Sequence, residues 1–249
     1  MTGSGLTSVW AIETSWTLIN AAAGGDSDKD AQHEILSRYY KPACKFLEML
    51  EHDAETAKDY AHDFFLAKVF KEEGEGVLEK VDRKRKFRPF LKRSLENYWR
   101  DQKRADARAR KRAWSPPEEA DDVGLDGLPG RNLIRAQAAF DHARVRGLLE
   151  RALERVRASC EEMGEGAYVD IFLARHYSDD DKPPSWREIG DRYGLGEKVV
   201  RHRSVTAARR FGAAIRQVLI EEEGSAAAAD EEVASLIEAL RSSDDNENE

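Results

Sequence analysis

The chain has 249 residues, of which 41% are hydrophobic and 35% charged, and its formal net charge is −8 at pH 7. This length allows one large or two small domains, each with a core of its own. No apolar run approaches the ~20 residues of a membrane span, and the N-terminus lacks the pattern of a secretory signal, so we expect a cytoplasmic protein without a membrane segment. The isolated cysteines, Cys44 and Cys160, give neither a disulfide framework nor a zinc-finger spacing, and we expect no metal and no cofactor.

Charge is distributed unevenly along the chain. Residues 83–112 carry a net charge of about +11, whereas residues 221–249 carry about −10. A segment as basic as 83–112 favours binding to phosphate backbones with strong salt dependence. The acidic average therefore does not exclude nucleic acid as a partner.

In the first half of the chain, apolar residues recur at helical spacing. The pattern predicts two helices around a short turn within residues 17–49 and a third helix at 57–70. A glycine-punctuated loop at 72–86 leads to a fourth helix at about 89–109.

The fourth helix interleaves aromatic and basic residues. This combination suits single-stranded nucleic acid, because bases stack on rings while cations hold the backbone. Tyr98 and Trp99 are adjacent and so point about 100° apart, which places at least one of them in a core. We expect Trp99 or Leu95 to serve packing. The side chains expected to be exposed are Asn97, Arg100, Asp101, Lys103 and Arg104.

In the second half, residues 114–130 are rich in proline, glycine and aspartate and predict a linker. Amphipathic helices are predicted at 144–160 and 168–177. Beyond residue 221 the sequence predicts a short helix and a disordered acidic end. No strand pattern appears, so the predicted fold is all-α, with two small helical domains joined by a flexible linker and followed by an acidic C-terminal extension.

Residues 185–211 predict a helix-turn-helix. Ser185 and Glu188 form a capping box for the first helix, and Gly194 supplies the positive φ that ends it. One face of the second helix carries hydrogen-bond donors where a DNA major groove would lie. The alternative is a solvated basic helix in an ordinary helical domain. The positions on that face are Lys198, Arg201, His202, Val205 and Arg209.

Four features in this order resemble one known family. They are Asp59-Tyr-Ala-His-Asp-Phe-Phe-Leu-Ala-Lys-Val-Phe70, the basic helix with Phe90-Leu-x-x-x-Leu-x-Asn97, a linker, and the C-terminal helix-turn-helix. Together they resemble an extracytoplasmic-function (ECF) sigma factor of bacterial RNA polymerase, and the opening Thr14-Ser-Trp-Thr-Leu-Ile is similar to large groups of that family. The similarity extends from residue 14 to about residue 219.

The resemblance implies a domain organisation and a set of partners. Residues 14–110 correspond to the region-two domain, which binds the polymerase β′ subunit and melts the promoter −10 element. Residues 111–143 correspond to the linker, and residues 144–220 to the region-four domain, which reads the −35 element and touches the β subunit. Residues 221–249 lie beyond the family pattern. Because the chemistry in this family belongs to the polymerase, the chain is expected to be no enzyme and to have no catalytic residues.

The resemblance also implies roles for particular residues. The loop at 72–86 falls where the family holds a flipped promoter base. For Phe64 and Phe65, packing in the core is favoured over contact with polymerase. The positions of the polymerase-binding helix are Asp59, His62, Asp63, Phe64 and Phe65, those of −10 binding and melting are Asn97, Arg100, Asp101, Lys103 and Arg104, and those of −35 binding are Lys198, Arg201, His202 and Arg203.

The chain departs from the family pattern just before the polymerase-binding helix. Many members have a dense acidic stretch there, whereas this chain has Glu55-Thr-Ala-Lys-Asp59. A phosphate on Thr56 would restore about −1.5 to −2 of charge near a helix N-terminus. We therefore hypothesise that a Ser/Thr kinase activates the protein at Thr56. The alternative is tolerated drift of a surface sequence.

Other interpretations remain open at this point. The acidic extension solvates the terminus, folds back on the basic faces, or binds a partner, and a separate anti-sigma factor is a further means of control. The main alternative function is a helix-turn-helix regulator that binds duplex DNA without core polymerase, which leaves the aromatic and basic helix without a role. An interaction module such as an adaptor fits the acidic extension but not the two basic segments.

Overall fold

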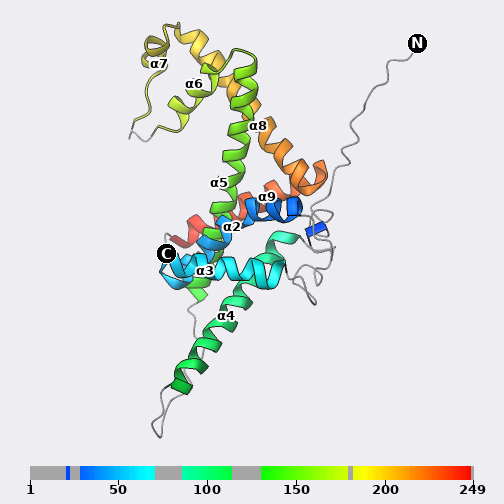
Figure 1. Ribbon diagram of the computed structural model, residues 1–249. Helices are drawn as coiled ribbons and strands as arrows, with labels where there is room; N and C mark the ends of the chain where they lie inside the picture. The colour runs from blue at the N-terminus through cyan, green and yellow to red at the C-terminus, as the bar shows by residue number, and fades with distance from the viewer. Residues whose placement is uncertain (1–20, 23–28, 71–85, 114–129, 179–181, 248–249) are drawn as a thin grey trace, which may run out of the picture. The chain divides into compact units, whose positions relative to one another are not determined.

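The computed structural model describes residues 21–22, 29–70, 86–113, 130–178 and 182–247, and in these ranges the regular structure is helical, without strands. The all-α prediction is confirmed for this part of the chain (Figure 1). The chain divides into two compact units. Unit 1 comprises residues up to Val145 together with those from Val233 onward, and unit 2 comprises Arg146–Glu232. None of the described helices is long and apolar enough to cross a membrane.

Unit 1 is built around α2 and the helices that pack against it. The elements are α2 (Lys29–Glu51), α3 (Ala54–Phe64), the π-helical turn η1 (Phe65–Val69), α4 (Phe87–Ala113), and the parts of α5 (Gly130–Glu162) and α9 (Ala226–Glu247) that belong to this unit. α3 packs along α2, and it begins where the Asp53 carboxylate accepts a hydrogen bond from the Thr56 N–H at 2.8 Å. A side-chain oxygen at this position satisfies a helix N–H that has no partner within the helix.

Aromatic rings fill the centre of the unit 1 core. The Phe64 ring lies 5.4 Å from that of Phe65 and 5.5 Å from that of Tyr98, measured between centroids. Leu95 is fully buried and Trp99 nearly so. The prediction that Trp99 or Leu95 serves packing is confirmed for both.

The predicted linker at residues 111–143 is wrong up to Ala113, where α4 ends, and from Gly130 onward, where α5 begins. Ala136 and Phe140 are fully buried in the unit 1 core. The proline- and glycine-rich composition that indicated a linker ends at residue 130, and beyond it the apolar residues recur at helical spacing. Residues 114–129 lie outside the described part of the chain.

Unit 2 contains α6 (Ala167–His176), α7 (Trp186–Tyr193) and α8 (Glu197–Glu223), with the remaining parts of α5 and α9. Both hydrogen bonds of the predicted capping box are present, from the Glu188 N–H to Ser185 Oγ at 3.2 Å and from the Ser185 N–H to Glu188 Oε2 at 2.6 Å. Gly194 ends α7 with a φ of 64°, a conformation that suits glycine because it has no Cβ. The sequence from Ser185 onward therefore folds as the predicted helix, turn and helix.

The acidic C-terminal extension is helical as far as Glu247, so the predicted short helix with a disordered end is wrong. Within unit 2 its first acids are paired with arginines. Arg155 contacts both oxygens of Glu221, at 2.9 and 2.7 Å, and Arg216 Nε lies 3.1 Å from Asp230. These acids thus pair with arginines of unit 2 and do not only solvate the terminus, but pairs this exposed contribute little to stability.

Candidate nucleic-acid interface

The outward face of α8 presents three cationic or titratable side chains and one valine. Lys198, His202, Val205 and Arg209 follow one another at four, three and four residues, a spacing that keeps side chains on one side of a helix. All four are exposed. The opposite face, with Val200, Ser204, Ala207 and Phe211, is buried in unit 2. The helix therefore combines a core face with a face that offers hydrogen-bond donors to solvent.

Arg201 lies on one flank of this face rather than at its centre. Its guanidinium contacts Glu197 Oε1 at 2.5 Å and lies 5.8 Å from the centre of the Trp186 ring. Arg175 of α6 lies 5.2 Å from the same ring. The contacts with Glu197 and Trp186 keep the Arg201 guanidinium at the edge of the helix-turn-helix.

Arg203 lies on the other flank of α8. Its guanidinium is 5.1 Å from the centre of the Tyr168 ring, which Arg210 also contacts at 5.8 Å. Arg210 in turn pairs with Glu165 at 2.5 Å. Of the four positions predicted for −35 binding, Lys198 and His202 thus lie on the outward face, whereas Arg201 and Arg203 contact rings on opposite flanks of the helix.

A hollow of about 450 Å³ lies beside the outward face in unit 2. Val205 and Arg209 of the outward face line this hollow, together with Trp186 of α7 and His176 of α6. Ser204 and Ala208 complete the lining. Sequence reasoning placed Val205 and Arg209 on this face but did not select them as site residues, although the spacing from Lys198 indicated them.

The outer side of α4 in unit 1 carries a second cationic face. Arg93, Asn97 and Arg104 are exposed and Arg100 is half-buried, and their spacing of four, three and four residues places them along one stripe. Arg100 pairs with Glu96 at 2.7 Å, and Arg104 pairs with Asp101 at 3.5 Å. The Arg104–Asp101 pair is exposed on both sides and contributes little to stability, so Arg104 is available to a phosphate.

Lys103, in contrast, belongs to the inner side of α4, so its predicted exposure is wrong. Its Nζ lies 2.5 Å from a Glu51 oxygen and 5.5 Å from the centre of the Tyr60 ring, and Trp99 Nε1 donates a hydrogen bond to the same carboxylate. Burial, followed by the hydrogen bond to Asp106 at 3.1 Å, raises the pKa of Tyr60 to about 12. Lys103 follows Trp99 by one helical turn, which brings it to the face that packs against α2 and α3.

The residues predicted to bind polymerase divide into two groups. Asp59, His62 and Asp63 are exposed on α3. Phe64 and Phe65 are 0% and 1% exposed, so both rings lie in the core of unit 1, although Phe65 also lines the groove described below. The favoured interpretation, that they pack in the core, is confirmed.

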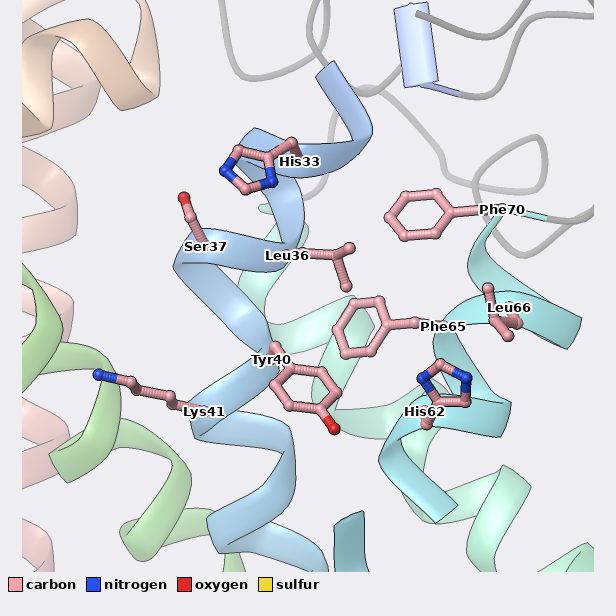
Figure 2. Close-up of a pocket in the computed structure, with 9 residues that line it drawn as sticks. All are labelled: His33, Leu36, Ser37, Tyr40, Lys41, His62, Phe65, Leu66 and Phe70. Carbon is pink, nitrogen blue, oxygen red and sulfur yellow. The ribbon is translucent and has the colours of Figure 1, made fainter. Parts of the chain in front are cut away.

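An apolar groove of about 460 Å³ lies between α2 and the end of α3. Figure 2 shows Leu36 and Tyr40 of α2 facing Phe65, with His62 and Leu66 beside them. Leu66 is 56% exposed, and it follows His62 by one turn on the helix. Leu66 and the groove residues of α2 were not among the predicted site residues. The sequence signal that indicated Leu66 was its four-residue spacing from His62, which places the two side chains on one side of the helix.

Thr56 occupies the first turn of α3. Hydrogen bonds from the side chain and the backbone N–H of Thr56 lower the pKa of Asp53 below its ordinary value. Lys58, two residues further, pairs with Glu55 at 2.6 Å, and both of these side chains are exposed. Anionic groups are stabilised at a helix N-terminus, so this turn already holds one carboxylate and has a cation nearby.

Several predicted features lie outside the described residues, namely the opening motif at 14–19 and the loop at 72–85. Among the described residues, no group of three or more histidine, cysteine or acidic side chains is placed to hold a metal ion. The chain matches no protein-family model, no curated protein and no solved structure.

Proposed function

We propose that the protein is a sigma factor of bacterial RNA polymerase, of the ECF group, which directs core polymerase to promoters in the cytoplasm and has no enzymatic activity. One observation carries the proposal: the two units each present a cationic helix face, on α4 and on α8, and each of these helices buries its other face in a core. A sigma factor needs two DNA-binding surfaces because it contacts two separate promoter elements.

On this proposal, unit 2 reads the −35 element with the outward face of α8. The helix-turn-helix supports this assignment, because its second helix is the element that enters a major groove. Lys198, His202 and Arg209 are the donors on that face, and Arg201 and Arg203 flank it. Each of these side chains binds either a base edge or a phosphate.

Unit 1 melts the −10 element with the outer stripe of α4. Arg93, Arg100 and Arg104 hold the phosphate backbone, while Asn97 and Asp101 offer hydrogen bonds to bases. Trp99 and Tyr98 are buried and support the helix instead of stacking on bases.

Core polymerase docks on the exposed side of α3, with the β′ subunit against Asp59, His62 and Asp63 and the β subunit against unit 2. Leu66 and the neighbouring groove add an apolar contact area. The docking surface lacks the dense acidic stretch found in many family members, so unmodified protein binds core weakly. Phosphorylation of Thr56 by a Ser/Thr kinase supplies the missing negative charge, and an anti-sigma factor is a further means of control.

Co-elution with core polymerase tests the proposal. Full-length protein, Thr56→Glu and the neutral control Thr56→Gln are each mixed with core polymerase and separated by gel filtration. We expect Thr56→Glu to co-elute with core and Thr56→Gln to do so weakly. If all three elute apart from core and bind duplex DNA alone, the protein is a helix-turn-helix regulator that acts without polymerase.

A further inference from the structure

Val205 is an apolar side chain on the outward face of α8, between His202 and Arg209. It is 49% exposed, whereas Val200 on the core face is fully buried. A β-branched residue also lowers helix propensity relative to alanine. Unlike Val199, which is also exposed on α8, Val205 lies among the hydrogen-bond donors of the outward face, where a ligand bound by those donors would contact it.

The surroundings of Val205 restrict what that ligand is. Lys198 and His202 precede it on the same face, and Arg209 follows one turn later. Val205 also borders the hollow lined by Trp186 and Ala208, and none of the described residues that line this hollow carries a carboxylate. The ligand therefore has acceptor or anionic groups around a small apolar group.

A thymine in the major groove of duplex DNA has this combination. Its C5-methyl group is the apolar group that unmodified base pairs present in that groove, and base-edge acceptors and phosphates surround it. Apolar side chains distinguish thymine from the other bases through this methyl group. We propose that Val205 contacts a thymine methyl group and so determines sequence specificity at one position of the DNA site. This inference rests on the proposed binding of unit 2 to duplex DNA.

Removal of the methyl group from the DNA tests the contact directly. Duplexes are first selected from a random-sequence pool with the full chain, alone and with core polymerase. Each thymine of the selected site is then replaced by deoxyuridine, which lacks only the methyl group, and the Kd is measured for wild type, Val205→Ala and Val199→Ala. Val199 is a matched control because it is also exposed, at 43%, on α8 but off the outward face.

We expect one thymine position at which deoxyuridine weakens wild-type binding by about fourfold, the factor that corresponds to burial of one methyl group. Val199→Ala keeps this sensitivity, and Val205→Ala binds the thymine and deoxyuridine duplexes equally. If a duplex is selected but no position is sensitive, or Val205→Ala remains as sensitive as wild type, the inference is wrong while DNA binding stands. If no duplex is enriched, the proposed DNA binding fails and the inference fails with it.

Discussion

Arg88 of α4 and Asp141 of α5 form an ion pair of 2.5 Å in unit 1, with side chains that are only 5% and 4% exposed. Lys92 contacts the second oxygen of Asp141 at 2.8 Å, and Arg88 also donates to Ser235 Oγ of α9 at 2.6 Å. The first turns of α4 are thereby joined to α5 and α9. Two of the bases in the basic segment thus serve the fold, which confines the DNA-binding surface proposed for α4 to its outer stripe.

Asp141→Asn is expected to destabilise unit 1 by about 3 to 5 kcal/mol, because Arg88 keeps a buried positive charge after its partner is neutralised. Urea unfolding followed by circular dichroism measures the loss. Asp101→Asn is the matched control, since its pair with Arg104 is exposed and is worth at most about 1 kcal/mol. Equal effects of the two substitutions would show that the buried pair has no special role.

Gly190→Ala is expected to destabilise the helix-turn-helix by roughly 1 to 3 kcal/mol. A Cβ at this position would lie 2.5 Å from the carbonyl oxygen of Leu195, which is backbone and has little room to move. Gly212→Ala on the exposed side of α8 meets nothing within 4 Å and should stabilise the helix by about 0.5 to 1 kcal/mol. The thermal midpoints of both variants check the pair, and a lower midpoint for Gly212→Ala than for Gly190→Ala contradicts the packing described for the turn.

The capping box makes part of the stability of unit 2 dependent on pH. Hydrogen bonds with the Ser185 side chain and then with its backbone N–H hold the pKa of Glu188 below the ordinary value of 4.5. A carboxylate with a lowered folded pKa stabilises the fold above its unfolded pKa and loses that contribution as the pH falls through its folded pKa.

We therefore expect wild type to have a higher thermal midpoint than Glu188→Ala at neutral pH, with a difference that shrinks as the pH falls below 4.5. Glu188→Gln keeps an acceptor without the charge and should lie between the two. A difference that is independent of pH would mean that the charge of Glu188 does not contribute.

Substitutions on the two sides of α4 should have different effects on DNA binding. Arg104→Ala on the outer stripe is expected to weaken binding and to reduce the slope of log K against log salt by about 1, because one phosphate contact is lost. Lys103→Met removes the inner pair with Glu51 and should lower stability while the slope stays unchanged. Titrations at several salt concentrations, with melting curves as the control, measure both, and a reduced slope for Lys103→Met would place Lys103 at the interface.

The features that depend on neighbouring residues could be predicted from the sequence. Ser185, Glu188 and Gly194 determine the ends of α7 through hydrogen bonds and backbone conformation within a few residues. The angle between adjacent helical residues likewise predicted that Trp99 or Leu95 packs in the core, and both do. These signals are local, so the sequence alone is enough to predict these features.

Features that depend on residues far apart in the chain could not be predicted. The positions of Arg201 and Arg203 follow from contacts with Trp186 of α7 and Tyr168 of α6. Arg88 and Asp141 lie 53 residues apart in the chain, so a count of charges along the sequence does not show that they pair. For the same reason, the sequence did not separate the bases that are available to DNA from those that serve the fold. In the structure, Arg88 and Lys92 pair with Asp141, and Lys103 pairs with Glu51.

Run-off transcription with core polymerase tests the sigma-factor proposal most directly. The template carries a site selected with the full chain and core, and reactions contain wild type, Thr56→Glu or Thr56→Gln. We expect transcripts that start at a fixed distance from the selected site, that require the chain, and that are more abundant with Thr56→Glu than with Thr56→Gln. Absence of transcripts with every form, on a template that the chain binds without core, would contradict the proposal and support the regulator instead.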